Sequence, residues 1–118
     1  MLYTFAAALV LLLLRYSFAL SVKPDRYYYR AAHVGQTVRF PCETDLDENV
    51  NWKLVHVVEY IYVRGRITPE LAPRVTVDKN NSYTLTIRNV TTDDAALYRC
   101  CEDDGLGSKR FYRLTVTG

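Results

Sequence analysis

The sequence has no run of basic residues and little net charge. Its 118 residues include 15 Lys and Arg against 13 Asp and Glu, which gives a formal net charge of +2. No basic stretch is interleaved with aromatic side chains, whereas proteins that bind nucleic acid concentrate positive charge on one surface to neutralise phosphates. The composition therefore argues against a nucleic-acid partner.

Histidine is scarce, and metal-ligand spacing is missing. His33 and His56 are the two histidines, and neither is spaced to activate a serine or cysteine as a nucleophile. The run CCEDD, residues 100–104, offers thiols and carboxylates but has no second cluster of ligands at a suitable spacing. We therefore expect a protein that is not an enzyme, with no catalytic residue, no metal and no cofactor.

Long apolar runs are missing except near the start of the chain. Residues 5–14 are continuously apolar, which is too short to span a bilayer. Small residues follow, and this pattern predicts a secretory signal peptide over residues 1–20, with cleavage after Ala19 or Ser21. No basic residue precedes the run, which leaves an uncleaved membrane anchor as the alternative. Residues 21–118 are then one domain, secreted or on the extracellular face of the plasma membrane.

Helical periodicity is absent, and apolar residues instead alternate with polar ones in short segments. Such alternation predicts strands with one buried face, and two antiparallel sheets packed face to face bury these faces at this chain length. The sequence therefore predicts an all-β protein, a two-sheet β-sandwich. The alternation places Trp52, His56, Leu85 and Ile87 on inward faces.

Three separately placed features resemble the immunoglobulin superfamily. The segment GQTVRFPC, which ends at Cys42, is similar to the second strand of that fold, and Trp52 follows ten positions later. The segment DDAALYRC, which ends at Cys100, matches the pattern Asp-x-Ala/Gly-x-Tyr-x-Cys. The resemblance implies an immunoglobulin-like Greek-key sandwich of the variable type (V-set), with the intermediate set as the alternative.

The resemblance also assigns structural roles to particular residues. It implies a core disulfide between Cys42 and Cys100. Tyr98 occupies the position of the tyrosine corner, where it belongs to the core and its hydroxyl bonds to the backbone. Arg74 is placed to form a salt bridge with Asp94, as in variable-type domains, and the alternative is two exposed charges without contact.

The third cysteine, Cys101, directly follows Cys100. Because successive side chains of a strand point to opposite faces, Cys101 is expected to point outward and to be exposed. An odd cysteine in an exported protein indicates intermolecular pairing or a free thiol. A disulfide-linked homodimer or heterodimer and a free or shielded thiol are therefore both open hypotheses.

The sheet that resembles strands C, C′, F and G of the family carries the candidate protein-binding face. Its outward positions combine aromatic, arginine and β-branched side chains, which make a good interface core, and the family commonly uses this sheet for ligand contact. The alternative is an outer surface without a partner. The expected face consists of Lys53, Val55, Val57, Tyr60, Tyr62, Arg99, Phe111 and Arg113.

Two further patterns concern the surface. The run RYYYR, residues 26–30, predicts an edge strand with one tyrosine packed and the others exposed, and a binding patch is the alternative. The sequons that begin at Asn80 and Asn89 predict N-glycans at both positions, with chance occurrence of a short motif as the alternative.

The sequence thus predicts a secreted or cell-surface recognition or adhesion module that binds a protein partner, or a second copy of itself. The alternatives are a soluble decoy or immune-type effector that acts without a membrane segment, and a structural matrix component. Membrane association is expected only if a downstream segment is missing or the signal stays uncleaved.

Overall fold

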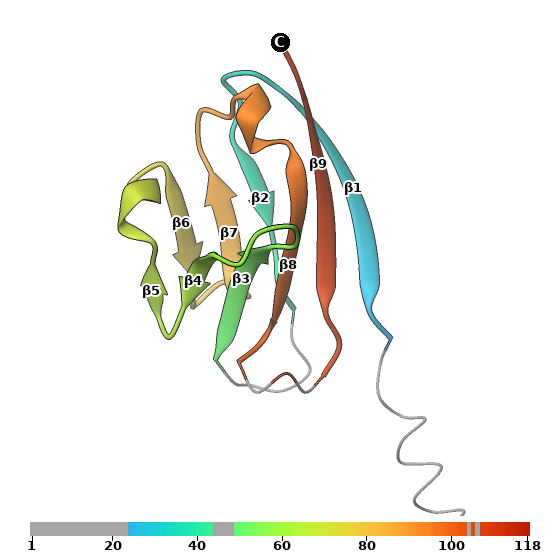
Figure 1. The fold of residues 1–118 in the computed structure, drawn as a ribbon, viewed down its shortest axis with the longest axis vertical. Coiled ribbons are helices and arrows are strands. Elements are labelled where there is room, and N and C mark those ends of the chain that lie inside the picture. Colours follow the sequence, from blue (N-terminus) through green and yellow to red (C-terminus); the bar gives the residue numbers. More distant parts are fainter. Residues whose placement is uncertain (1–23, 44–48, 104, 106) are drawn as a thin grey trace, which may run out of the picture.

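The computed structural model describes residues 24–43, 49–103, 105 and 107–118, which form two β-sheets (Figure 1). The expected signal peptide, residues 1–20, and its cleavage positions Ala19 and Ser21 lie outside the described residues. The strands are β1 (Arg26–His33), β2 (Val38–Phe40), β3 (Val50–Leu54), β4 (Tyr60–Val63), β5 (Arg66–Ile67), β6 (Val75–Asp78), β7 (Thr84–Ile87), β8 (Ala96–Glu102) and β9 (Arg110–Thr117). Two 3₁₀ helices, η1 (Pro69–Leu71) and η2 (Thr92–Asp94), lie in loops.

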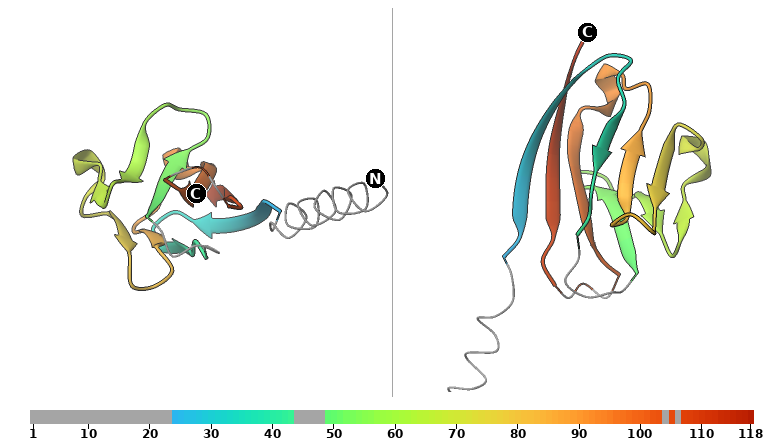
Figure 2. Two further views of the ribbon diagram at one scale, coloured as in Figure 1. Left: turned by 90° about the horizontal axis from the view of Figure 1, so that it is seen from below. Right: turned by 180° about the vertical axis from the view of Figure 1, so that it is seen from behind.

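The two sheets differ in size. One has six strands in the order β1-β9-β8-β3-β4-β5, and the other has three in the order β2-β7-β6 (Figures 1 and 2). The immunoglobulin-like sandwich is confirmed, but one pair departs from the antiparallel arrangement, since β1 runs parallel to β9. These strands come from opposite ends of the domain, so no hairpin dictates their relative direction.

The core between the sheets holds the four hydrophobic residues expected there. Trp52 and Leu85 are fully buried, and Ile87 and Tyr98 are nearly so. Trp52 Nε1 donates a hydrogen bond to the carbonyl oxygen of Tyr83 at 2.8 Å, which satisfies the polar atom of the indole and avoids the cost of burying it unpaired. Each such side chain contributes about 1.5–3 kcal/mol through burial.

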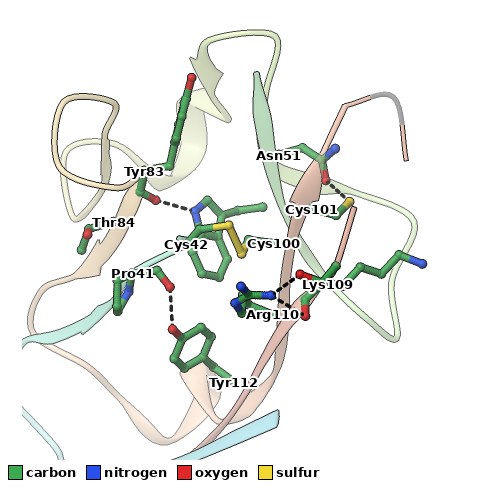
Figure 3. The surroundings of a disulfide bond; sticks show 12 residues. Pro41, Cys42, Asn51, Tyr83, Thr84, Cys100, Cys101, Lys109, Arg110 and Tyr112 are labelled. Carbon is green, nitrogen blue, oxygen red and sulfur yellow. Dashed lines mark hydrogen bonds between the residues drawn. A yellow bond between two sulfur atoms is a disulfide. The ribbon is translucent and has the colours of Figure 1, made fainter. Parts of the chain in front are cut away.

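A disulfide joins the two sheets through this core (Figure 3). Cys42 follows β2 and Cys100 lies in β8, with the two Cα atoms 6.1 Å apart and 58 positions between the residues in sequence. The expected pairing is therefore present. Closing a loop of this length stabilises the fold by on the order of 4 kcal/mol on the chain-entropy account.

Alternation predicts the direction of a side chain only as far as the strand extends. The inward position expected for His56 is wrong, because β3 ends at Leu54 and His56 lies exposed in the following turn. The next hairpin, between β4 and β5, turns at Arg64 and Gly65, whose φ angles are +54° and +76°. Positive φ at both positions is typical of the tight turn whose twist matches that of the flanking strands.

Asp94 organises one end of the sandwich. The guanidinium of Arg74 donates two hydrogen bonds to its carboxylate, at 2.8 and 3.0 Å. The same carboxylate accepts from the backbone N–H of Thr91 at 2.8 Å, and the backbone carbonyl of Asp94 accepts from the Tyr98 hydroxyl. The hydrogen bonds that Arg74 donates to Asp94 raise the pKa of Arg74. The expected salt bridge and tyrosine corner are thus parts of one network.

None of the helices in the described ranges has the length and apolar character needed to cross a bilayer.

Candidate protein-binding face

Strand register gathers one row of side chains on the outer surface of the six-stranded sheet. Lys53 of β3 lies opposite Arg99 of β8, Arg99 lies opposite Phe111 of β9, and Phe111 lies opposite Tyr27 of β1. Directly opposed residues share a face, and this face points away from the three-stranded sheet because Trp52 and Cys100, the neighbours in sequence, are buried in the core. We call this surface the outer face.

Aromatic side chains form the β1 end of the outer face. The rings of Tyr27 and Phe111 stack with centroids 4.6 Å apart and planes 6° from parallel. Tyr27 is 62% exposed and Tyr29 is 79% exposed. Tyr29 lies opposite Arg113 in the register. Flat, exposed rings of this kind offer a large contact area that loses little conformational freedom on binding.

Positive charge runs through the centre of the outer face. Lys53 Nζ lies 5.6 Å from the centre of the Tyr60 ring, a cation–π contact. Lys53, Arg99 and Arg113 are each half-buried, and within the described part of the chain none of them forms an ion pair. The Arg99 Nε is buried without a hydrogen-bond partner there. The surface can therefore accept carboxylates from a partner.

Apolar residues border the face on the side of β4. Val55 is half-buried, and Val57 and Val58 are 45% and 87% exposed in the turn that leads to β4. This turn lines an open hollow whose lining also includes Tyr60 and Leu71. Hydrophobic groups thus lie beside the charged centre, as in the core and rim of protein interfaces.

Most of the chain matches a known protein family. Residues 28–117 match the family model of the immunoglobulin V-set domain. The chain belongs to the immunoglobulin V-set family. The match covers most of the chain and decides between the two expected subtypes, since it is the variable set and not the intermediate set that matches. No curated protein sequence matches the chain.

Solved structures of other immunoglobulin domains share the fold of this V-set chain. The CD2-binding domain of CD58 is 22% identical with a TM-score of 0.55, over 78% of this chain and 53% of that one. A chain in the crystal structure of ICOS in complex with ICOS-L and an anti ICOS-L VNAR domain is 16% identical with a TM-score of 0.59, over 78% and 55%. The V-set chain thus aligns with about half the length of these two. An IG27 protein domain is 17% identical with a TM-score of 0.55, over 81% and 94%.

Tyr62 was expected on the outer face, and this expectation is wrong. Tyr62 is 8% exposed and belongs to the core, where burial raises the pKa of its hydroxyl. A β-bulge is the cause: Trp52 lies opposite Tyr62, but the next residue, Lys53, lies opposite Tyr60. The extra residue of β4, Ile61, changes the alternation, so Tyr60 points outward with Lys53 and Tyr62 does not.

The expectation of an exposed Cys101 is also wrong. Cys101 lies opposite Asn51 on the side of the sheet away from the disulfide, but it is 6% exposed (Figure 3). Its thiol donates to Asn51 Oδ1 at 3.4 Å, and Asn51 Nδ2 donates to Asp103 Oδ1 at 3.0 Å. Neighbouring side chains therefore cover a cysteine whose direction alternation gave correctly. This burial supports the shielded thiol, and an intermolecular disulfide through Cys101 stays an untested alternative.

The outer face also includes residues that sequence reasoning did not assign to it. Tyr27 and Tyr29 join the face because β1 pairs with β9, and Tyr28 between them is half-buried, so the expected pattern of one packed tyrosine and two exposed ones is confirmed. The alternation in RYYYR carries the signal for exposure. The pairing that attaches it to this sheet is a contact between distant segments, which no local pattern contains.

The two glycosylation positions lie away from the strands of the outer face. Asn80 is exposed in the turn between β6 and β7, and Asn89 is exposed just after β7. Both belong to the three-stranded side of the sandwich. The structure leaves both side chains accessible, and glycan attachment at Asn80 and Asn89 stays a prediction.

Proposed function

We propose that this V-set chain is an extracellular recognition module that binds a protein partner through the outer face. The observation that carries the proposal is the row Lys53, Arg99, Phe111 and Tyr27. It places cations that form no ion pair within the described ranges beside two stacked rings, of which Tyr27 is exposed. Arginine and aromatic side chains are the types that dominate the binding energy of protein interfaces. The composition suits a partner that presents carboxylates around an apolar centre.

Proteins of the same fold support the class of partner. The aligned domain of CD58 binds CD2, and ICOS was crystallised in complex with ICOS-L. Both are interactions between proteins. We extend only this class to the V-set chain, because the identities, 22% and 16%, are too low to transfer a particular ligand.

The proposal includes export from the cell. Its support is the apolar run at residues 5–14, which predicts a signal peptide over residues 1–20, and a core disulfide, which persists in oxidising compartments. A soluble decoy or immune-type effector would use the same outer face. A structural matrix component is less well supported, because polymerisation through Cys101 would require an exposed thiol.

A binding comparison with matched variants tests the proposal. A multivalent form of the V-set domain is applied to an array of extracellular proteins to find those that bind it. The array includes the V-set chain itself as a candidate homophilic partner. For any partner found, Arg99→Glu and Tyr27→Ala are expected to weaken binding by on the order of thirtyfold for Arg99 and tenfold for Tyr27, measured by surface plasmon resonance.

Arg39→Glu serves as the matched control, since Arg39 is exposed on β2 of the other sheet. It introduces the same charge change and is expected to leave affinity unchanged. Circular dichroism melts establish that all three variants fold. Equal weakening by Arg39→Glu, or full binding by both outer-face variants, would place the interface elsewhere.

A further inference from the structure

The sandwich is open along one side, away from the outer face. β1 is the edge of the six-stranded sheet and β2 is the edge of the three-stranded sheet, and the two do not pair (Figure 2). A cavity of about 100 Å³ lies between them. Its lining consists of Tyr28, Arg30, Pro41, Glu43, Arg110 and Tyr112. These β1 residues alternate with Tyr27 and Tyr29, so the cavity and the outer face lie on opposite sides of the sheet.

Two guanidinium groups line this cavity, and contacts with neighbouring residues hold both in place. Arg110 is 6% exposed, and its Nη1 donates to Ser108 Oγ at 2.6 Å. The same nitrogen donates to the carbonyl oxygen of Lys109 at 3.5 Å (Figure 3). The guanidinium of Arg30 lies 5.5 Å from the ring centre of Tyr28 and 5.7 Å from that of Tyr112. These contacts fix both groups without neutralising their charge.

Neither guanidinium has a counter-ion among the described residues. Glu43 is the acidic residue in the lining, and it is not at ion-pair distance from Arg30 or Arg110. Two cations and one anion give the cavity a net charge of +1. A charge as deeply buried as that of Arg110 is costly unless a partner balances it. An anion from outside the domain would supply that balance.

Hydrogen-bond donors in the cavity are also available. The Tyr28 hydroxyl has no hydrogen-bond partner in the part of the chain that the structure describes, whereas the Tyr112 hydroxyl donates to the carbonyl oxygen of Pro41 (Figure 3). Burial raises the pKa of Tyr112 to about 12, so this hydroxyl stays neutral at physiological pH. Tyr28 and the two arginines can thus donate to one acceptor group.

We propose that this cavity binds a single oxyanion group, a carboxylate, sulfate or phosphate, between Arg30 and Arg110. Guanidinium groups suit such ligands because their planar N–H donors match two oxygens at once. The volume, about three times the share of a water molecule in the liquid, admits one such group and excludes a ring or a peptide segment. The site is separate from the outer face and does not depend on it.

Titration of the folded domain with inorganic anions tests the site. Sodium sulfate, sodium phosphate and sodium acetate are added at an ionic strength held constant with chloride, and the side-chain Nε–H signals of Arg30 and Arg110 are followed by NMR. Wild-type protein is expected to show saturable shifts at both side chains at millimolar concentrations. The order of the three affinities distinguishes a tetrahedral sulfate or phosphate from a planar carboxylate.

Three variants sharpen the test. Arg30→Gln removes an exposed guanidinium and is expected to lower the affinity by on the order of tenfold. Glu43→Gln removes the repelling carboxylate and is expected to raise it by about two- to fivefold. Arg66→Gln, in β5 at the opposite edge of the six-stranded sheet from β1, is expected to leave the titration unchanged. Shifts that stay linear in anion concentration, or an Arg30→Gln variant that binds like wild type, would overturn the proposal.

Discussion

At the scale of single residues, burial of the Cys101 thiol limits how fast the protein reacts with oxidants and thiol reagents. Cys100 is consumed in the core disulfide, whereas Cys101 lies beneath neighbouring side chains with its thiol on Asn51. A thiolate must reach solvent to react. The reactivity of Cys101 is therefore limited by opening of the structure around β8.

We expect Cys101 to react with a maleimide at least on the order of tenfold more slowly in the native protein than in urea, as measured by mass spectrometry over time. Unreduced protein should run as a monomer on a denaturing gel. The Cys101→Ser variant is the control and should show no labelling in either condition. Rapid native labelling, or a covalent dimer that this variant abolishes, would contradict the burial of the thiol.

The sequence correctly predicted whether single side chains of a strand point into the core or away from it. Alternation from Tyr98 through Cys100 gave the inward face of β8 and, with the family resemblance, the disulfide partner. Alternation could not give the exposure of Cys101, because that exposure depends on side chains from other segments. Pairing of β3 with β8 places Asn51 opposite Cys101, and the Asn51 amide donates a hydrogen bond to Asp103. The burial of Cys101 therefore follows from the packing of the assembled sheet and not from the local sequence.

At the scale of secondary structure, adjacent residues of β1 lie in two different environments. Tyr28 stacks on Tyr112 with ring centroids 4.9 Å apart, while Tyr29 points to solvent at 79% exposure. The two residues are chemically identical and adjacent. Their contributions to the free energy of unfolding should differ only through this packing.

Tyr28→Ala is expected to lower the free energy of unfolding by about 2–3 kcal/mol, because it removes a half-buried ring and its stacking on Tyr112. Tyr29→Ala, the matched control, should change it by no more than about 0.5 kcal/mol. Urea denaturation followed by tryptophan fluorescence measures both. Equal losses would show that β1 does not pack on β9 in the register described.

The strands themselves were largely predictable, and their irregularities were not. Period-two alternation identified the segments around Trp52 and Leu85 that became β3 and β7, because a half-buried strand imposes that period on its sequence. The bulge beside Trp52 that turns Tyr62 inward leaves no such trace. The parallel pairing of β1 with β9 likewise depends on a contact between residues more than eighty positions apart.

At the scale of the whole molecule, buried tyrosines link stability to alkaline pH. Burial raises the pKa of Tyr98, and it raises the pKa of Tyr112 from 10.0 to about 12. Above pH 10 an unfolded chain releases these protons while the folded chain retains them. The stability that depends on the neutral hydroxyls is therefore complete below pH 10 and is lost as the pH rises through 12.

We expect the free energy of unfolding to fall between pH 10 and pH 12, with Tyr112 alone accounting for on the order of 2 kcal/mol. Urea midpoints across this range measure the slope. Tyr112→Phe should be less stable at neutral pH, since it loses the hydrogen bond to Pro41, but its slope should be shallower. An unchanged slope in this variant would mean that Tyr112 ionises equally in both states.

The parallel pairing of β1 with β9 has a mechanical consequence. Because the two strands run in the same direction, Arg26 and Thr117 lie at opposite poles of the domain (Figure 1). Tension applied between these poles pulls β1 one way and β9 the other, so the load falls lengthwise along their shared ladder. All of its hydrogen bonds then resist together rather than one after another. The domain is thus arranged to hold its shape under a pull transmitted through its two ends.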